Sequence, residues 1–435
     1  MGTYHSKPHV VALQGDSGDA ALDLPEHVVV ALHELAGACK EGLLALAVGT
    51  GMQVMQSLFE EEVTAIAGPK GKHNPERTAV RHGSEAGGVT LGGRRVAVQR
   101  PRVRTADGAQ EVSVPAYDAF AGRDQLSRMA LERMLAGLST RRYATGLEPV
   151  GSAIEERASG TSKSAVSRRF VQLTRTALEE LMTRRLEDLD ILVLLVDGVR
   201  VADHLCVVAL AIDGDGQKHP VGLVQGATEN GTVVRHLLED LVARGLRFDG
   251  GLLVVIDGSK ALRSAVTMVF GRHALVQRCQ EHKYRNVTDH LPKEQQGFVG
   301  RKLRAAYGLS DAAAAHRELE ALARHLDGIH PGAAASLREG LEETLTVQRL
   351  HLGPQLTRVL RSTNPIESMI GRGRHVAHNV TRYRDGEMAL RWTAAGMSEA
   401  RKSFRRIKGH RELGLLRAAL HAHVAAEIDQ NRRIA

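Results

Sequence analysis

The sequence predicts an α/β protein built around a mixed β-sheet in which buried strands end at aspartates. Residues 191–200, ILVLLVDGVR, begin with six consecutive apolar residues that stop at Asp197. Residues 252–258, LLVVIDG, repeat this design with Asp257. Continuous apolar runs of this length, bounded by charge and glycine, are typical of strands buried on both faces. If the two strands are neighbours, their aspartates lie side by side at one edge of the sheet.

Composition favours a globular protein of several domains. The chain has 435 residues, of which 43% are hydrophobic and 25% charged, as in ordinary globular proteins. No apolar run of eighteen residues and no signal-peptide layout occur, so we expect neither a membrane-spanning nor a secreted protein. Three widely spaced cysteines, Cys39, Cys206 and Cys279, exclude a disulfide framework and a four-cysteine zinc site. A cytoplasmic location is therefore expected.

Positive charge is concentrated in two segments, although the net charge of the whole chain is only +8. Residues 70–104 contain nine Lys and Arg against two glutamates, and residues 371–411 contain eleven against three acidic residues. The rest of the chain is net negative. This distribution indicates a polyanionic partner such as nucleic acid. The aromatic content of 3% disfavours base stacking as the main mode of binding.

The N-terminal part is predicted to hold a flexible tail, 1–24, and then a helical region with a basic hairpin, 25–105, for DNA binding or dimerisation. The helical pattern over 25–67 predicts breaks at Gly49 and Gly51 and a stop at Gly68. Residues 87–105 alternate like a hairpin that turns at Gly92-Gly93. Its arginines are interpreted as phosphate contacts because they cluster without acidic partners, the alternative being a solvated charged hairpin. They are Arg94, Arg95, Arg100, Arg102 and Arg104.

Residues 106–185 are predicted to form a second, helical DNA-binding region. The stretch from 126 to 182 has a helical pattern. Within it, a turn at Gly160 and an N-cap at Ser162 precede a basic helix, an order typical of a helix-turn-helix. The candidate phosphate contacts in this region are Arg141, Arg142, Lys163, Arg168 and Arg169.

The segment 186–280 has the element order of an RNase H-like core. After the first aspartate strand come two further strands that complete a meander, then a helix, the second aspartate strand, a helix and a short strand. Their expected ranges are 191–197, 205–213, 219–227, 228–244, 252–257, 259–270 and 274–277. The segment 281–360 is almost wholly helical in pattern, so we interpret it as an all-α insertion. The segment 361–435 then supplies the closing helix of the core and a basic C-terminal region.

A third carboxylate is offered by RSTNPIESMIGRGR, residues 361–374. Ser362 or Thr363 is expected to cap a helix opened by Pro365, with Glu367 in its first turn. The helix dipole alone could account for a carboxylate there. The arginines that follow, Arg372 and Arg374, instead favour a site that binds divalent cations together with phosphates.

Three carboxylates at one sheet edge suit two Mg²⁺ ions, with Mn²⁺ as a substitute, held roughly 3.5–4 Å apart. The metals activate water or a 3′-hydroxyl and stabilise the leaving oxygen. The sequence offers no compelling Ser/His or Cys/His nucleophile, and it lacks the G-x-x-x-x-G-K-[ST] loop of P-loop NTPases. Asp197, Asp257 and Glu367 are therefore the candidate catalytic and metal-binding residues.

Four motifs in order make the chain resemble the Mutator-type bacterial insertion-sequence transposases. They are LVDG at 195–198, VVIDG at 254–258, Cys279-x-x-His282 followed by Arg285-Asn286, and STNPIES at 362–368. The resemblance covers about 50–415. It implies an RNase H-like DDE core with the triad Asp197, Asp257 and Glu367, and a helical insertion before the glutamate.

The resemblance further implies Mg²⁺-dependent cleavage at terminal inverted repeats and transfer of the 3′-hydroxyl to target DNA. It also implies a homodimer or larger assembly that associates with the nucleoid when bound to DNA. Two other functions stay open: an RNase H-like structure-selective nuclease that does not join strands, and a transposase-derived DNA-binding regulator without activity. Whether the element passes through a circle or is simply excised is also open.

Several further residues are candidate supports of the active site or DNA contacts. Cys279 and His282 have zinc-ligand spacing, but no second pair completes a site, so a structural or DNA-contacting role is favoured over metal binding. Trp392 is either a core anchor or a contact to DNA ends. The remaining candidates are Arg285, Asn286 and Asn364 near the motifs, and Arg382 and Arg384 in the C-terminal region.

Overall fold

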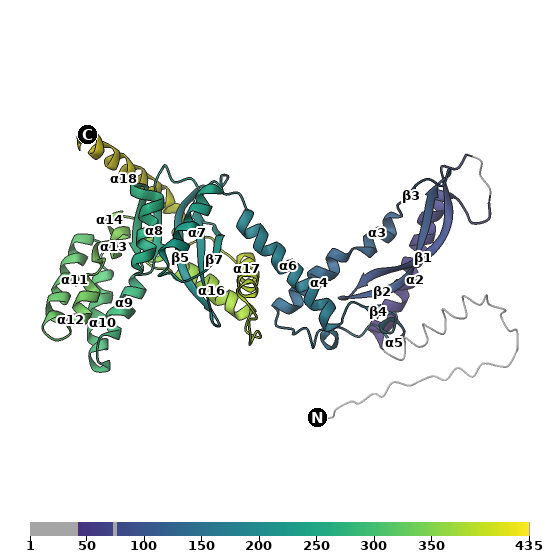
Figure 1. Ribbon diagram of the computed structural model, residues 1–435, viewed down its shortest axis with the longest axis horizontal. Helices are drawn as coiled ribbons and strands as arrows, with labels where there is room; N and C mark the ends of the chain where they lie inside the picture. The colour runs from purple at the N-terminus through teal and green to yellow at the C-terminus, as the bar shows by residue number, and fades with distance from the viewer. Residues whose placement is uncertain (1–41, 73–75, 435) are drawn as a thin grey trace, which may run out of the picture. The chain divides into compact units, whose positions relative to one another are not determined.

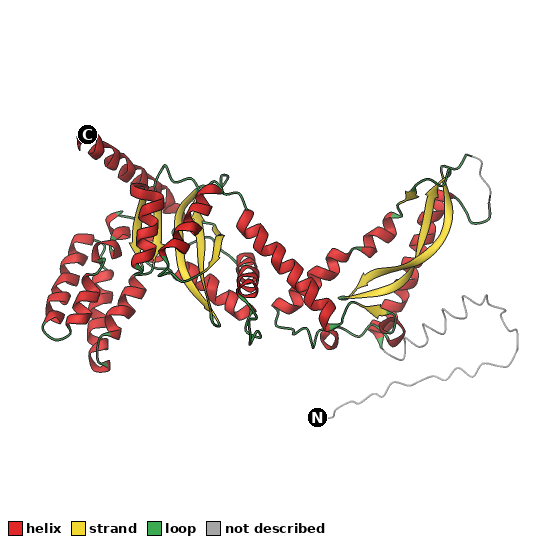
Figure 2. Cartoon of the chain, viewed as in Figure 1, coloured by secondary structure: helices red, strands yellow, loops and turns green. Residues whose placement is uncertain are grey.

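The computed structural model describes residues 42–72 and 76–434 (Figure 1, Figure 2). They form two compact units. The first contains the described residues up to 122 together with 147–159, and the second contains 123–146 and everything from 160 onward. The predicted region 106–185 is therefore not a unit of its own, because the chain passes between the two units within it. The predicted tail and Cys39 lie outside the described residues.

In the first unit a long helix, α2, packs on an antiparallel hairpin of strands β1 and β2. Met55, Phe59 and Val63 of α2 share a hydrophobic core with the valines of the hairpin. Short strands β3 and β4 both pair with β2. The elements are α2 (Leu43–Ala67), β1 (Ala79–Leu91), β2 (Arg94–Thr105), β3 (Glu111–Val112), α3 (Pro115–Ala121), α5 (Ser152–Glu155) and β4 (Ala158–Ser159).

The hairpin turns at Gly92-Gly93 as predicted, with positive φ at both residues, although it begins earlier than expected, at Ala79. The predicted breaks at Gly49 and Gly51 are wrong, because α2 runs through both. A glycine inside a helix costs roughly 1 kcal/mol relative to alanine, and the apolar face that α2 buries on the hairpin outweighs this. The helix does end at Gly68.

The second unit begins with two helices, and the predicted helix-turn-helix is not formed there. They are α4 (Arg123–Leu135) and α6 (Lys163–Thr183), with a single 3₁₀ turn, η1 (Ala144–Gly146), in the intervening stretch. Ser162 caps α6 as predicted, its hydroxyl accepting the Ala165 N–H. The residues before Gly160, however, form the one-turn helix α5 and strand β4 of the other unit. Helix α6 instead packs on α4 and on the C-terminal helix α17 (Gly386–Lys402).

A five-stranded sheet is the centre of the second unit, in the order β7-β6-β5-β8-β9. The first three strands in sequence, β5, β6 and β7, form the predicted antiparallel meander, and β8 and β9 add parallel to β5. Two helices follow β7 and β8 at the predicted places. The elements are β5 (Ile191–Val201), β6 (His204–Asp213), β7 (Lys218–Gln225), α7 (Gly231–Ala243), β8 (Leu252–Ile256), α8 (Lys260–Phe270), η2 (Gly271–His273) and β9 (Ala274–Arg278).

Strand β5 does not stop at Asp197, as the sequence suggested, but continues to Val201. Its antiparallel partner β6 pairs with it as far as Val201, whereas its parallel partner β8 pairs only up to Val196. Because β8 ends while β6 continues, the second half of β5 has a hydrogen-bonded neighbour on one side only. The alternation of exposed Gly198 and Arg200 with buried Val199 reflects this change.

Alternate residues of β5 face two different hydrophobic layers. Leu194 and Val196 pack with α7 and α8, and Val193, Leu195 and Val199 pack with the helices α15 to α18. The latter layer contains the closing helix that was predicted to carry Glu367. Its elements are α15 (Pro354–Leu360), α16 (Asn364–Val376), α17, η3 (His410–Glu412) and α18 (Leu413–Ile434).

The residues between β9 and α15 form a helical block with its own hydrophobic core (Figure 1). Leu303, Leu319 and Leu337 are fully buried in it. Its elements are α9 (Gln280–Asp289), α10 (Lys293–Tyr307), α11 (Ala312–Asp327), α12 (Pro331–Arg338), α13 (Leu341–Thr344) and α14 (Thr346–Arg349). The helical reading of 281–360 is thus confirmed.

Helices α16 and α17 touch at a pair of glycines. A Cβ placed on Gly396 would lie 2.8 Å from the Cα of Gly373, a distance too short for any side chain. This contact sets how closely α17 approaches the helix that carries Glu367. None of the helices formed by residues 42–72 and 76–434 is long and apolar enough to cross a membrane.

Candidate active site

Strands β5 and β8 bring the two predicted aspartates to the same place on the sheet. The parallel register ends with the pair Val196 and Ile256, so Asp197 and Asp257 each follow the last paired residue of adjacent strands. Neighbouring strands lie about 4.8 Å apart. The prediction that the two aspartate strands are neighbours is confirmed. In the alternation of β5, Asp197 shares its face with Val193, Leu195 and Val199, and this face is covered by α16.

Backbone N–H groups hold one oxygen of each aspartate. Oδ1 of Asp197 accepts the N–H of Gly198 at 2.8 Å, and Oδ1 of Asp257 accepts the N–H of Ser259 at 2.8 Å. The Ser259 hydroxyl caps helix α8 by accepting the Leu262 N–H. Each aspartate therefore keeps its second oxygen for other contacts, while the first is fixed to rigid backbone.

Glu367 reaches the site from the first turns of α16, where Pro365 opens the helix as predicted. Thr363 is the N-cap residue, but its hydroxyl makes no capping bond. The hydroxyl donates instead to Oε1 of Glu367 at 2.8 Å. Thr363 thus occupies the expected N-cap position, but its hydroxyl orients Glu367 rather than accepting a backbone N–H of the first turn.

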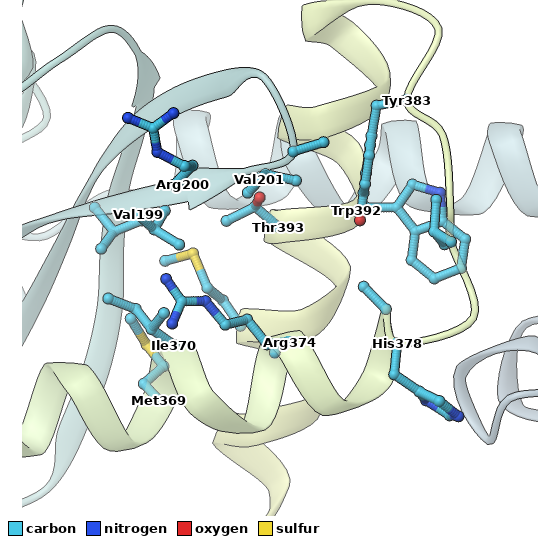
Figure 3. A pocket seen from close by; sticks show the side chains of 16 residues that line it. Val199, Arg200, Val201, Met369, Ile370, Arg374, His378, Tyr383, Trp392 and Thr393 are labelled. Carbon is cyan, nitrogen blue, oxygen red and sulfur yellow. The ribbon is translucent and has the colours of Figure 1, made fainter.

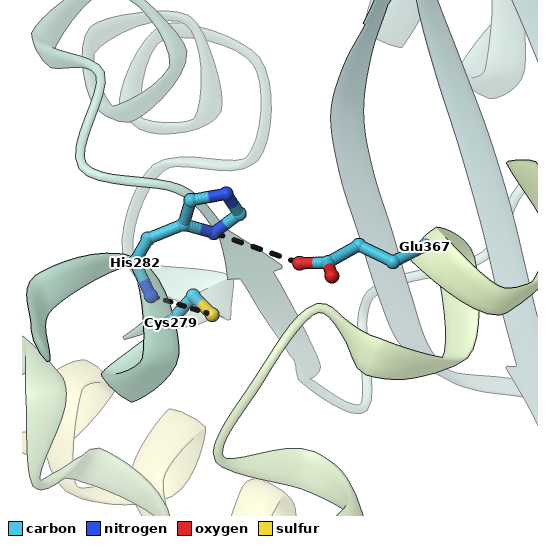
Figure 4. A group of neighbouring side chains, drawn as sticks. All are labelled: Cys279, His282 and Glu367. Atoms are coloured by element: carbon cyan, nitrogen blue, oxygen red, sulfur yellow. Dashed lines mark hydrogen bonds and ion pairs between the residues drawn. The ribbon is translucent and has the colours of Figure 1, made fainter. Parts of the chain in front are cut away.

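Cys279 and His282 lie beside Glu367 (Figure 4). Cys279 is the N-cap of α9, and its Sγ accepts the His282 N–H at 3.5 Å, so their spacing is that of an N-cap and the third helical residue. Sγ also accepts the backbone N–H of Thr363 at 3.4 Å. His282 Nδ1 lies 3.8 Å from Oε1 of Glu367. Through these hydrogen bonds Cys279 links α9 to the start of α16.

The acidic and basic groups of the site shift one another's pKa. Burial, together with the nearby charges of Asp257 and Glu367, raises the pKa of Asp197 to about 6. Burial likewise raises the pKa of Asp257. The hydrogen bond with Cys279 raises the pKa of His282 to about 9 against the effect of burial, and Asp197 and Glu367 add to this rise. At neutral pH the site thus combines three carboxyl groups with one imidazolium.

The thiol of Cys279 shows two opposing effects. Burial would raise its pKa, but hydrogen bonds from His282 and Thr363 outweigh burial and hold the pKa below its ordinary value. Its Sγ, a ring nitrogen of His282 and a carboxylate oxygen of Glu367 lie within 4.8 Å of one another. The sequence alone does not show a further side chain beside the Cys-x-x-His pair. In the folded chain, Glu367 takes this place.

An open pocket of about 480 Å³ adjoins Asp257. His282 and Asn286, both predicted supports of the site, line it, and so does Glu229. Glu229 was not predicted, and neither was Thr363. A signal for Thr363 existed, since it stands four residues before Glu367, one helical turn away. Glu229 lies in the loop between β7 and α7, where the sequence pattern carries no comparable signal.

Other predicted support residues are near the site in the chain but make different contacts. Arg285 is exposed on α9, and Asn364 is the exposed first residue of α16. Arg372 donates to the backbone oxygen of Ser403. Trp392 is 7% exposed and packs on Phe170 of α6, their ring centroids 4.5 Å apart. This packing places Trp392 in the hydrophobic interior beside α6, and a contact of its remaining surface with DNA ends stays a prediction.

The arginines of the hairpin are not free of acidic partners, contrary to the interpretation from sequence. Arg100 pairs with Glu85, and Arg102 binds both carboxylate oxygens of Glu111. Arg104 lies 3.6 Å from the same Glu111. Two arginines at the turn bind backbone carbonyls, and Arg94 also lies 3.8 Å from a carboxylate oxygen of Glu155. Arg94, 4% exposed, donates to the oxygen of Glu148, and Arg95 donates to that of Ala121.

The predicted DNA-contacting residues of the second unit lack a side-chain partner more often than the arginines of the hairpin do. Within the part of the chain that the structure describes, five of them are exposed with no side-chain hydrogen bond or ion pair: Arg141, Arg142, Lys163, Arg168 and Arg382. Two others have partners. Arg169 donates to the backbone oxygen of Gly160, and Arg384 pairs with Asp385.

Comparison with known proteins gives a consistent result. The sequence profile of the Mutator family of transposases matches residues 32–406. The transposase of insertion sequence element ISRM5 from Rhizobium meliloti is 27% identical over 84% of this chain and 92% of its own length. That of IS6120 from Mycolicibacterium smegmatis is 29% identical over 54% and 71%. That of IS256 in transposon Tn4001 from Staphylococcus aureus is 29% identical over 61% and 67%.

Proposed function

Because the chain belongs to the Mutator family of transposases, we propose that it cuts DNA strands at the terminal inverted repeats of its own insertion sequence and joins the freed 3′-hydroxyl to target DNA. The observation that carries this proposal is the convergence of three carboxylates. Asp197 and Asp257 follow the last paired residues of adjacent parallel strands, and Glu367 comes from a helix that covers the same face of β5. This is the donor arrangement expected of a metal-dependent DNA strand transferase.

The topology supports an RNase H-like interpretation of the core. An antiparallel meander continued by two parallel strands, in the order β7-β6-β5-β8-β9, matches the element order predicted for that fold. In this interpretation the helical block between β9 and α15 is an insertion that separates Asp257 from Glu367. Its separate hydrophobic core supports an independent packing module rather than an extension of the sheet.

The residues of the site fit divalent cations. Asp197 is 7% exposed, and among the residues described here no lysine or arginine forms an ion pair with Asp197, Asp257 or Glu367. Buried carboxylates without such partners are costly, and hard cations such as Mg²⁺ take carboxylate oxygens as ligands. Burial is the main cause of the raised pKa of Asp197, and the nearby charges of Asp257 and Glu367 add to it.

Two Mg²⁺ ions, when bound, would activate a water or 3′-hydroxyl and stabilise the leaving oxygen. The chain's own groups fix the geometry. The N–H groups of Gly198 and Ser259 orient the two aspartates, and the Thr363 hydroxyl orients Glu367. His282, protonated at neutral pH, offers positive charge beside the carboxylates, where a scissile phosphate would lie.

DNA is the proposed partner, bound through the exposed and unpaired cations of the second unit. Unpaired arginines and lysines release counterions when they meet phosphates, so binding should weaken steeply with salt. Two ends of one element must be cut and joined together, and we propose that two copies of the chain do this as a homodimer.

A strand-transfer assay tests the function. Labelled DNA that carries the element's ends, taken from the DNA that flanks this gene, is incubated with Mg²⁺ and the wild type, Asp257→Asn or Asp249→Asn. Asp249 is exposed and eight residues away, so its substitution is a matched control. We expect joined products from the wild type and the control and none from Asp257→Asn.

The other outcomes separate the alternatives. Cleavage without joining would favour a structure-selective nuclease. Tight binding of the ends without chemistry from any variant would favour a DNA-binding regulator. Equal joining by the wild type and Asp257→Asn would remove Asp257 from the proposed mechanism.

A further inference from the structure

A mostly apolar cavity of about 310 Å³ lies between β5, α16 and α17 (Figure 3). Val199 and Val201 line it from β5, and Tyr383 and Trp392 line it from the segment that leads into α17 and from α17 itself. Arg374 extends into this region from α16. Its volume is at the lower end of the range for small-molecule sites. Nothing in the proposed strand-transfer chemistry uses this cavity.

The cavity continues the row of residues that carries the carboxylates. Asp197, Val199 and Val201 share one face of β5, so the two valines lie ~7 and ~13 Å beyond the aspartate along an extended strand. On α16, Arg374 is seven residues after Glu367 and therefore ~10 Å along the helix. A strand of DNA that passes the carboxylates in this direction reaches the cavity within a nucleotide or two.

The cavity also carries one cation that no described residue neutralises. Arg374 is exposed and forms no side-chain hydrogen bond or ion pair within residues 42–72 and 76–434. Its neighbour in the lining, Arg200, points to the opposite side of β5 (Figure 3). The site therefore offers apolar and aromatic walls, with Arg374 extending into it while the side chain of Arg200, also in the lining, points away.

We propose that this cavity receives one nucleobase, unstacked from the DNA beside the scissile phosphate, with Arg374 on the phosphate of that nucleotide. This inference rests on the proposed action at DNA ends. A base presents flat faces to Trp392 and Tyr383, and it is attached to the anion that Arg374 lacks. An aliphatic ligand or an apolar protein side chain would fill the cavity but leave Arg374 unpaired. Extruded bases are held in this way by stacking against aromatic and apolar walls.

Fluorescence of 2-aminopurine tests the proposal. The analogue is placed in turn at each of the nucleotides that flank the cleavage position, and the full-length protein is added in Ca²⁺ so that binding is observed without cleavage. We expect a severalfold rise at one position with the wild type. Ala377→Phe, which fills the cavity from the end of α16, should bind the DNA ends and lose this rise. Ala425→Phe, the same change on the exposed side of α18, should keep it.

An abasic nucleotide at the responsive position gives a second, complementary measurement. In Mg²⁺, Ala377→Phe should cleave intact DNA roughly 100-fold more slowly than the wild type, because a misplaced strand loses alignment. With the abasic strand it should regain the wild-type rate, since no base competes with the new phenyl ring. Rescue of this kind would not follow from a variant that is simply misfolded.

The results separate failure of this inference from failure of the proposed function. Ends that are bound and cleaved with no rise at any position would overturn the base-binding cavity and leave strand transfer intact. A rise that persists in Ala377→Phe would also overturn it. Binding with the expected rise but no cleavage in Mg²⁺ by the wild type would reject the function and keep the cavity. Failure of the wild type to bind the ends would reject both.

Discussion

The β1–β2 hairpin and the carboxylate edge of the five-stranded sheet are both rich in charged side chains. They differ in whether those side chains have partners of opposite charge. In the hairpin, Arg100 and Arg102 have glutamate partners, and Arg94 donates hydrogen bonds to a backbone carbonyl. At the sheet edge, no lysine or arginine forms an ion pair with Asp197 or Asp257 among the described residues. Charge that is already neutralised stabilises its own fold, whereas charge left without a partner at a rigid edge is available for a ligand.

The largest effect on activity is expected from substitution of Asp197, a buried carboxylate without a lysine or arginine partner. Asp197→Asn should reduce strand cleavage at least about 100-fold, because it removes one of the oxygens proposed to bind the metal ions. In metal-free buffer at neutral pH the same variant should be more stable than the wild type by about 1–2 kcal/mol, since it removes a buried charge that faces two others. Cleavage assays and urea unfolding measure the two effects. A variant that loses both activity and stability would contradict the comparison.

The next effect concerns how the third carboxylate is held. Thr363→Val should reduce cleavage roughly 10- to 100-fold and raise the Mg²⁺ concentration needed for half-maximal rate, because Glu367 loses the hydroxyl that orients it. Thr363→Ser keeps the hydroxyl and is the matched control. Magnesium titrations of the cleavage rate distinguish the two. A normal magnesium dependence for the valine variant would show that Glu367 does not need this hydrogen bond.

A smaller effect should separate free from compensated arginines in DNA binding. Arg141→Ala should lower the slope of log binding constant against log salt by about 1, as expected for the loss of one phosphate contact. Arg102→Ala should change it by less, because Glu111 already occupies the guanidinium. Salt titrations of end binding by each variant measure this. Equal slopes for the two variants would mean that the hairpin exchanges Glu111 for DNA.

The smallest effect is a pH dependence of the hairpin itself. The hydrogen bond with Arg102 lowers the pKa of Glu111 to about 2. Because the folded pKa is below the unfolded one, this pair stabilises the fold above the unfolded pKa, and the stabilisation is lost as pH falls from about 4.3 toward 2. Unfolding of the wild type should therefore depend more on pH in this window than that of Glu111→Gln. The pair is exposed, so the difference should be slight and should shrink in high salt.

Much of the sheet could be predicted from the sequence because its strands are buried on both faces. The apolar runs before Asp197 and Asp257 have no other stable solution in a globular chain, and the meander between them is marked by turns. The end of β5 was misjudged for a physical reason. Gly198 and Arg200 look like a strand end, but only the parallel neighbour stops there, and one sequence does not show where a partner strand ends.

The errors elsewhere come from tertiary contacts that override local signals. Gly49 and Gly51 were expected to break α2, which buries too much apolar surface on the hairpin to be interrupted. Arg102 and Arg104 were interpreted as unpaired because Glu111 comes from a later strand, β3. The partner of Arg100, Glu85, precedes the stretch in which the hairpin was expected. At the site, the three carboxylates could be predicted by residue type and order. Their electrostatic partner His282 and the hydroxyl of Thr363 take their roles only from the folded arrangement.

The separation of Glu367 from Asp257 along the chain has a consequence for the timing of synthesis. More than one hundred residues, including the whole helical block, are translated between the two carboxylates. A ribosome that has produced both aspartates has therefore not yet produced Glu367, the third candidate carboxylate. The hairpin and the sheet strands exist in the nascent chain well before α16 can dock and be fastened through Cys279 and Thr363. A product truncated in that interval would retain the hairpin and both aspartates without the third carboxylate, and under the proposed function it should not cleave DNA.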